Sequence, residues 1–183
     1  IGKFDLQSKR IEERFTGDID IADDWQIGLI VGKSGTGKTT IAKQLFPDAY
    51  VTAFDYNAEA IVDDMPKAKS IDEITRTFNS VGFSSPPSWL KPYSVLSNGE
   101  KMRVDLASAI LDEKNFFVFD EFTSVVDRNV AQIGSFAMQK AIRKTDKKFI
   151  AVTCHADVED WLLPDWTFST DTMMFTEKKK KKT

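Results

Sequence analysis

The chain has 183 residues, of which 42% are hydrophobic, enough for one globular domain with a substantial core. It carries 25 basic and 28 acidic side chains, and five of the basic ones are the consecutive lysines Lys178–Lys182, so the body of the chain is clearly acidic. An acidic body argues against a broad DNA-binding face. No stretch reaches the roughly 20 apolar residues of a membrane span. The single cysteine, Cys154, excludes an internal disulfide and fits a reducing cytoplasm.

The pattern of apolar residues predicts strands that alternate with helices. In chain order we expect two β-like runs in DIDIADDWQIGLIVG, a helix over 39–46, a short strand in AYVTAFDY and short helices within 57–81. A proline-rich loop over 84–94, an amphipathic helix in LSNGEKMRVDLASAILDE, a strand in NFFVFDEF, a helix over 130–143 and a strand in KFIAVTCH follow. This alternation predicts a mostly parallel sheet flanked by helices.

The first segment with a recognisable chemistry is GKSGTGKT, which matches the phosphate-binding pattern G-x-x-x-x-G-K-[ST] in full. Glycines let such a loop curl its N–H groups inward, and the N-terminus of the following helix adds partial positive charge. Lys38 would reach the β- and γ-phosphates, and Thr39 would bind Mg²⁺. The loop residues that we expect to contact the nucleotide are Gly32, Ser34, Gly35, Thr36, Gly37, Lys38, Thr39 and Thr40.

A pair of carboxylates supplies the second half of the predicted site. The apolar strand FFVF delivers Asp120 and Glu121 to its carboxyl end, where α/β sheets bind ligands. Asp120 would hold Mg²⁺ through water, and Glu121 would polarise an attacking water molecule. The alternative is an acidic pair that faces solvent, which the adjacent phosphate loop disfavours.

The only histidine, His155, also follows a strand. A lone histidine is most often structural, but its place at the edge of the predicted site favours a hydrogen bond to the γ-phosphate. Its neighbour Cys154 is expected in the core rather than as a nucleophile.

Taken together and in this order, GKSGTGKTT, VLSNGEKMRVDLASAI, FFVFDEFTSVVD and TCH resemble the ATP-binding-cassette (ABC) ATPases, over residues of about 4–168. The resemblance implies that Ser97 and Gly99 contact the γ-phosphate held by a second protomer, and that Asp127 lies in a loop that crosses the dimer interface. It therefore implies a head-to-tail homodimer that closes on two Mg·ATP.

The sequence departs from this family in three places. The signature reads LSNGE where LSGGQ is usual, and Asn98 can adopt the left-handed backbone of the missing glycine. No glutamine loop is found, and Asp63 or Asp64 is a candidate replacement as a metal ligand, with a plain acidic turn as the alternative. Phe15 is a candidate for stacking on adenine, with a place in the core as the alternative.

The resemblance implies an ABC-type P-loop NTPase fold with a small helical subdomain, over about 57–110, and a reduced β-subdomain. We expect one nucleotide-binding domain over 1–176 and a disordered lysine-rich tail over 177–183. Three segments resemble the ATPase half of predicted proteins that join an ABC ATPase to an acetyltransferase-like domain. They are SVGFSSPPSWLKPYSVLSNGEK, FDEFTSVVDR and VTCHADVEDWLLPDW. Such a domain would follow Phe168.

These observations favour a non-transporter ATPase that drives or gates an attached or partner domain, with nucleic acid reached through a partner. One alternative is an ATP-binding switch that hydrolyses little ATP, which the altered signature motivates. A transporter ATPase subunit is a further alternative, disfavoured by the missing glutamine loop and the short chain. A P-loop kinase is disfavoured by the signature and the Asp-Glu pair.

Overall fold

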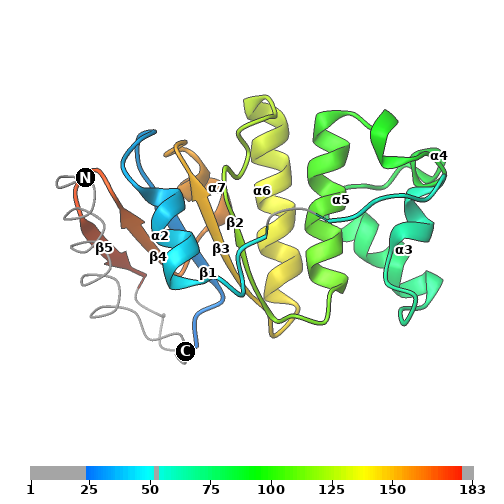
Figure 1. Ribbon diagram of the computed structural model, residues 1–183, viewed down its shortest axis with the longest axis horizontal. Helices are drawn as coiled ribbons and strands as arrows, with labels where there is room; N and C mark the ends of the chain where they lie inside the picture. Colours follow the sequence, from blue (N-terminus) through cyan, green and yellow to red (C-terminus); the bar gives the residue numbers. More distant parts are fainter. Residues whose placement is uncertain (1–23, 52–53, 179–183) are drawn as a thin grey trace. The chain divides into compact units, whose positions relative to one another are not determined.

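The computed structural model describes residues 24–51 and 54–178, and they fall into two compact units. The first unit comprises the described residues of 24–51, 116–124 and 148–178. The second comprises 54–115 and 125–147, so the chain leaves the first unit and returns to it twice. In Figure 1 the described residues of both units are coloured by their position in the sequence.

A five-stranded sheet organises the first unit, in the order β2-β3-β1-β4-β5. The strands are β1 (Ile27–Val31), β2 (Phe116–Phe119), β3 (Lys148–Thr153), β4 (Trp166–Ser169) and β5 (Met174–Glu177). The first four run parallel, and β5 pairs antiparallel with β4. Because β1 lies at the centre, Ile27 pairs with Phe149 on one side and Gly28 with Trp166 on the other. The predicted mostly parallel sheet is confirmed.

The core of this unit packs on both faces of β1. Ile27, Leu29 and Ile30 are fully buried, as expected for a central parallel strand. The helices of the unit are α2 (Lys38–Leu45), which buries Ile41 and Ala42, and α7 (Val158–Leu162). The prediction of a helix over 39–46 is thus right within one residue at each end.

The second unit is helical. Its elements are the short 3₁₀ helices η1 (Ile61–Asp64) and η2 (Tyr93–Val95) and the α-helices α3 (Ile71–Ser80), α4 (Pro86–Trp89), α5 (Asn98–Leu111) and α6 (Arg128–Arg143). Helix α5 contacts both α3 and α6. Gly134 of α6 leaves room for Met102 of α5, whose terminal carbon lies 2.2 Å from where a Cβ on Gly134 would stand. The two helices therefore approach closely at this point.

Two local predictions are wrong in part. Residues 84–94 were expected as a loop but contain α4 and η2, because Pro86 begins a helix at no cost to its hydrogen bonds, and Trp89 Nε1 donates to the Phe83 carbonyl at 2.8 Å. The strand expected in AYVTAFDY is, among its described residues, only a single parallel bridge between Tyr50 and Val118. Pairing stops there because the chain passes into the second unit.

Several expectations fall on residues outside the described part of the chain. They concern Phe15, the first β-like run and all of the lysine tail beyond Lys178. Within residues 24–51 and 54–178, no helix is both long and apolar enough to cross a membrane.

Candidate nucleotide site

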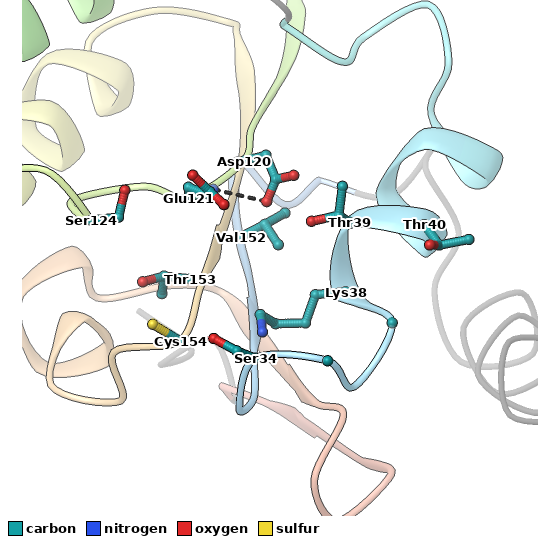
Figure 2. Close-up of a pocket in the computed structure, with 12 residues that line it drawn as sticks. Ser34, Lys38, Thr39, Thr40, Asp120, Glu121, Ser124, Val152, Thr153 and Cys154 are labelled. Carbon is teal, nitrogen blue, oxygen red and sulfur yellow. Dashed lines mark hydrogen bonds between the residues drawn. The ribbon is translucent and has the colours of Figure 1, made fainter. Parts of the chain in front are cut away.

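A cavity of about 400 Å³ opens at the carboxyl edge of the sheet, a volume within the usual range for small-molecule sites. The first unit supplies all its lining residues, which are Ser34, Gly35, Gly37, Lys38, Thr39, Thr40, Asp120, Glu121, Ser124, Val152, Thr153 and Cys154 (Figure 2). They come from the loop after β1, the start of α2 and the ends of β2 and β3. The structure thus brings the predicted phosphate loop and the two predicted carboxylates into one cavity.

The phosphate loop takes its shape from two left-handed residues. Gly35 has φ 83° and Gly37 has φ 89°, and nothing lies within 4 Å of a Cβ built on either, so backbone conformation rather than space requires glycine here. Gly37 directly precedes α2, which places the helix N-terminus at the cavity. Lys38 Nζ donates to the Lys33 carbonyl at 2.8 Å and so reaches back across the loop.

The turn after β4, which contains Thr170 and Asp171, is hydrogen-bonded to the phosphate loop. The Lys33 N–H donates to both carboxylate oxygens of Asp171, at 3.1 and 3.3 Å. The hydroxyls of Thr36 and Thr170 are hydrogen-bonded at 2.7 Å. The Oγ1 of Thr170 lies only 1.8 Å from where a Cβ on Gly32 would stand. The roles of Thr170 and Asp171 cannot be predicted from the sequence, because a Thr-Asp pair after a strand is indistinguishable from an ordinary turn.

The predicted carboxylates stand directly after β2. Asp120 is fixed through both oxygens, since Tyr50 Oη donates to Oδ2 at 2.7 Å and the Glu121 N–H donates to Oδ1 at 2.8 Å. Glu121 is exposed and has a left-handed backbone with φ 50°, and Thr123 follows with φ 69°. A non-glycine residue in this region costs energy and is found preferentially at functional sites.

The end of β3 contributes a histidine and a thiol. His155 is partly buried, and its Nδ1 lies 3.4 Å from Thr123 Oγ1, which ties it to the turn that carries Glu121. His155 does not itself line the cavity. Cys154 does, and it is exposed. The expectation that Cys154 lies in the core is therefore wrong, because β3 ends at Thr153 and the next residue turns outward.

The remaining predicted site residues belong to the second unit. Ser97 is the N-cap of α5 and forms a capping box with Glu100, in which each side chain accepts from the other residue's N–H, at 3.2 and 3.1 Å. Asn98 is the first residue of α5 and does not use the left-handed backbone that it could adopt. A Cβ on Gly99 would lie 3.0 Å from Val130 Cγ1. Asp127 caps α6 by accepting from the Val130 N–H at 2.9 Å.

The two candidate replacements for the glutamine loop differ in environment. Asp63 is exposed in η1, whereas Asp64 Oδ1 accepts from the N–H groups of Asn57 and Ala58, both at 2.9 Å. Asp64 thereby holds a turn. Within the described ranges, no group of three or more His, Cys, Asp or Glu residues could bind a metal ion. A hydroxyl and one carboxylate, from Thr39 and Asp120, nevertheless suit Mg²⁺, which typically takes one or two carboxylates together with substrate phosphates and water.

Comparison with known proteins identifies the chain. The family described as "ATPase family associated with various cellular activities (AAA)" matches residues 28–160, which is more than half of the chain. The chain belongs to this family of ATPases. As a member of this ATPase family with a complete phosphate loop, it binds and hydrolyses ATP.

Three similar proteins carry names that refer to transport. The chain is 27% identical over 157 residues to a probable peptide export ATP-binding protein, YydI, of Bacillus subtilis, covering 74% of this chain and 72% of the relative. The dimeric structure of a bacterial ABC transporter cassette has a TM-score of 0.63 at 13% identity, covering 82% of this chain and 83% of the other. A bacterial Atm1-family ABC exporter with ATP bound has a TM-score of 0.61 at 18% identity, covering 83% and 33%. These structural likenesses confirm the predicted P-loop NTPase fold of the ABC-cassette type.

Proposed function

We propose that this ATPase powers an export partner in a membrane, rather than serving the non-transporter role favoured by its sequence. The similarity to a probable peptide export ATP-binding protein carries this proposal, because it extends over 74% of the chain. The cytoplasm, where ATP is abundant and Cys154 stays reduced, is the compartment that this role requires. The second candidate is an attached acetyltransferase-like domain, which rests on the sequence resemblance alone, or a partner that acts on nucleic acid, which the altered LSNGE signature motivates.

The arrangement of the cavity supports a specific assignment of roles. The loop amides and Lys38 bind the β- and γ-phosphates, and the ammonium leaves the Lys33 carbonyl to do so. Thr39 and Asp120 would hold Mg²⁺, which would supply positive charge beside the phosphate oxygens.

Glu121 and His155 act at the γ-phosphate. Glu121 is exposed to the cavity and orients the attacking water, whose oxygen bonds to the γ-phosphorus as the bond to the β–γ bridging oxygen breaks. His155, held near Thr123, donates to a γ-phosphate oxygen. Ser97 and Gly99 complete the site of a second protomer, and Asp127 lies at the interface. ATP therefore closes a homodimer.

Replacing Glu121 by Gln tests the catalytic assignment. The amide keeps the size of the side chain but cannot accept a proton, so we expect steady-state phosphate release to fall by about 100-fold or more while ATP binding is unchanged. The measurements are phosphate release at saturating Mg·ATP and calorimetric ATP binding. Unchanged turnover in the variant would show that Glu121 does not act on water.

Flotation with membrane vesicles from the source organism tests the export role. The ATP-bound Glu121→Gln protein should float with vesicles that carry its partner, and Lys38→Ala, which lacks the phosphate contact, should float less. Vesicles stripped of protein serve as the control. If neither variant floats while the wild-type protein hydrolyses ATP, the export role is wrong and the ATPase assignment stands.

A further inference from the structure

Tyr50 is placed beside the predicted metal ligand by the chain segment that follows α2. Its N–H donates to the Phe46 carbonyl at 3.0 Å, and its backbone forms a parallel bridge with Val118 of β2. Val118 lies two residues before Asp120, so this bridge sets the side chain of Tyr50 next to the end of β2. Tyr50 Oη donates to Asp120 Oδ2 at 2.7 Å.

This hydrogen bond completes the support of the Asp120 carboxylate. The other oxygen, Oδ1, accepts from the Glu121 N–H at 2.8 Å. Each carboxylate oxygen has two lone pairs, so one hydrogen bond on each leaves an acceptor position free on each. The carboxylate is thus held in one orientation while it can still bind a cation or its water.

The ring of Tyr50 is itself held in place. It packs against the buried cluster that includes Phe46, Ala49 and Val118, and Lys43 Nζ lies 5.2 Å from its centroid. A phenolic hydroxyl carries its proton at neutral pH, so Tyr50 acts as the donor in its hydrogen bond to Asp120.

We propose that Tyr50 is a positioning residue for ATP hydrolysis, which orients Asp120 for the divalent cation without touching nucleotide or metal. This inference rests on the proposed role of Asp120 in binding Mg²⁺. Partners of metal-binding carboxylates commonly matter in this way, because a ligand that must be reoriented binds the metal more weakly. Local sequence gives no sign of it, since Tyr50 and Asp120 are joined only through the sheet.

Tyr50→Phe is the test, because it keeps the ring and removes only the hydroxyl. We expect the Mg²⁺ concentration for half-maximal phosphate release to rise about tenfold at fixed ATP. ATP binding in EDTA and the melting temperature without nucleotide should be close to those of the wild-type protein. A merely structural role would lower the melting temperature and leave the Mg²⁺ requirement unchanged.

Two further variants make the result unambiguous. Tyr93→Phe is the matched control, because Tyr93 Oη also donates to a carboxylate, that of Asp105, at 3.2 Å, but within the helical unit. It should leave the Mg²⁺ requirement unchanged. Asp120→Asn should raise that requirement more than Tyr50→Phe does. If Asp120→Asn raises it and Tyr50→Phe does not, the role of Tyr50 is refuted and the proposed function stands. If Asp120→Asn has no effect, the metal-binding role of Asp120 and the inference both fail.

Discussion

Gly32 and Gly37 serve the same loop for different physical reasons. Gly37 supplies a left-handed backbone at the start of α2, with open space around its missing Cβ. Gly32 has no such conformation and instead leaves room for the Thr170 hydroxyl. The motif pattern predicts glycine at both positions, but only the structure separates a conformational requirement from a steric one.

We expect Gly32→Ala to destabilise the protein by about 1–3 kcal/mol, because the new Cβ would overlap Thr170 Oγ1. Its affinity for ATP should fall as well, since the loop must shift. Chemical denaturation and calorimetric ATP binding measure the two effects. In a double-mutant cycle, Thr170→Ala should recover part of the loss. Strict additivity of the two substitutions would contradict the steric explanation.

At this scale, the sequence predicts the residues of the site but not their support. Lys38, Thr39, Asp120 and Glu121 follow from a motif and from a strand that ends in carboxylates, which are both local patterns. The residues that hold them, such as Tyr50 and Asp171, are far away in sequence and of types found in any turn or core. Their roles depend on the pairing of strands, which residue type alone does not reveal.

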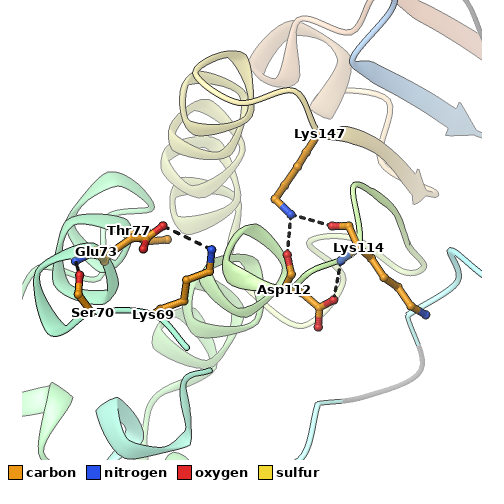
Figure 3. A network of polar contacts seen from close by, with 7 residues as sticks. All are labelled: Lys69, Ser70, Glu73, Thr77, Asp112, Lys114 and Lys147. Atoms are coloured by element: carbon orange, nitrogen blue, oxygen red, sulfur yellow. Dashed lines mark hydrogen bonds and ion pairs between the residues drawn. The ribbon is translucent and has the colours of Figure 1, made fainter. Parts of the chain in front are cut away.

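Helix α5 shows how one element serves both stability and the proposed function. Its N-terminus has the capping box of Ser97 and Glu100. At its other end, the buried Lys147 Nζ donates to the carbonyls of Asp112 and Lys114, both at 2.7 Å (Figure 3). Burial lowers the pKa of Lys147, although the charge of Asp112 opposes this. The N–H of Glu100 at one end of α5 and the carbonyl of its C-cap residue Asp112 at the other thus have side-chain partners.

The capping role of Ser97 must be separated from its proposed contact with a second protomer. Ser97→Ala should cost about 1 kcal/mol of stability through loss of the cap. Ser70→Ala is the matched control, because Ser70 caps α3 with the same bond, from the Glu73 N–H at 3.2 Å. Both should melt at slightly lower temperature, but only Ser97→Ala should lower phosphate release at saturating protein and Mg·ATP. Equal turnover in both would limit Ser97 to capping.

Asp105 of α5 predicts a pH dependence of stability. Burial raises its pKa, although hydrogen bonds from Tyr56 and Tyr93 and the charge of Lys101 oppose this. The folded protein therefore binds this proton more tightly than the unfolded chain, so the contribution is present below the ordinary carboxyl pKa and is lost as pH rises through the raised value.

Asp105→Asn removes this titration. The unfolding free energy of the variant relative to the wild-type protein should rise as the pH increases above the ordinary carboxyl pKa. Urea denaturation at several pH values measures the difference. A difference that stays constant with pH would show that the pKa of Asp105 is not raised.

Elements with a strong periodic or motif signal agree with the sequence prediction. The strand at Ile27–Val31 and the helix at Arg128–Arg143 are within two residues of their expected bounds. The strands β4 and β5 were not predicted, because each has only four residues and the turn between them contains neither glycine nor proline. Short strands of this kind are fixed by their neighbours rather than by their own composition.

At the scale of the whole molecule, formation of the proposed homodimer should depend on protein concentration. The specific rate of phosphate release should climb with protein concentration at saturating Mg·ATP, because each site needs residues from two chains. The mass of Glu121→Gln, measured by light scattering, should double when ATP is added. A monomeric mass together with a rate per chain that does not depend on concentration would refute the shared site.

The division into domains stays a prediction. The second unit comprises more than the helical subdomain expected over about 57–110, because α6 belongs to it although β2 precedes this helix in the chain. Hydrophobic periodicity predicts α6 as a helix but cannot say which unit it joins. That information lies in contacts such as that between Gly134 and Met102.

The central place of β1 in the sheet also matters during synthesis on the ribosome. This strand emerges early, but both strands that flank it, β3 and β4, are made after the entire helical unit. Until then the apolar segment Ile27–Val31 lacks both of the strands that pair with it in the folded sheet. The same arrangement that brings the phosphate loop to the edge of the finished sheet thus leaves this apolar segment unpaired during synthesis.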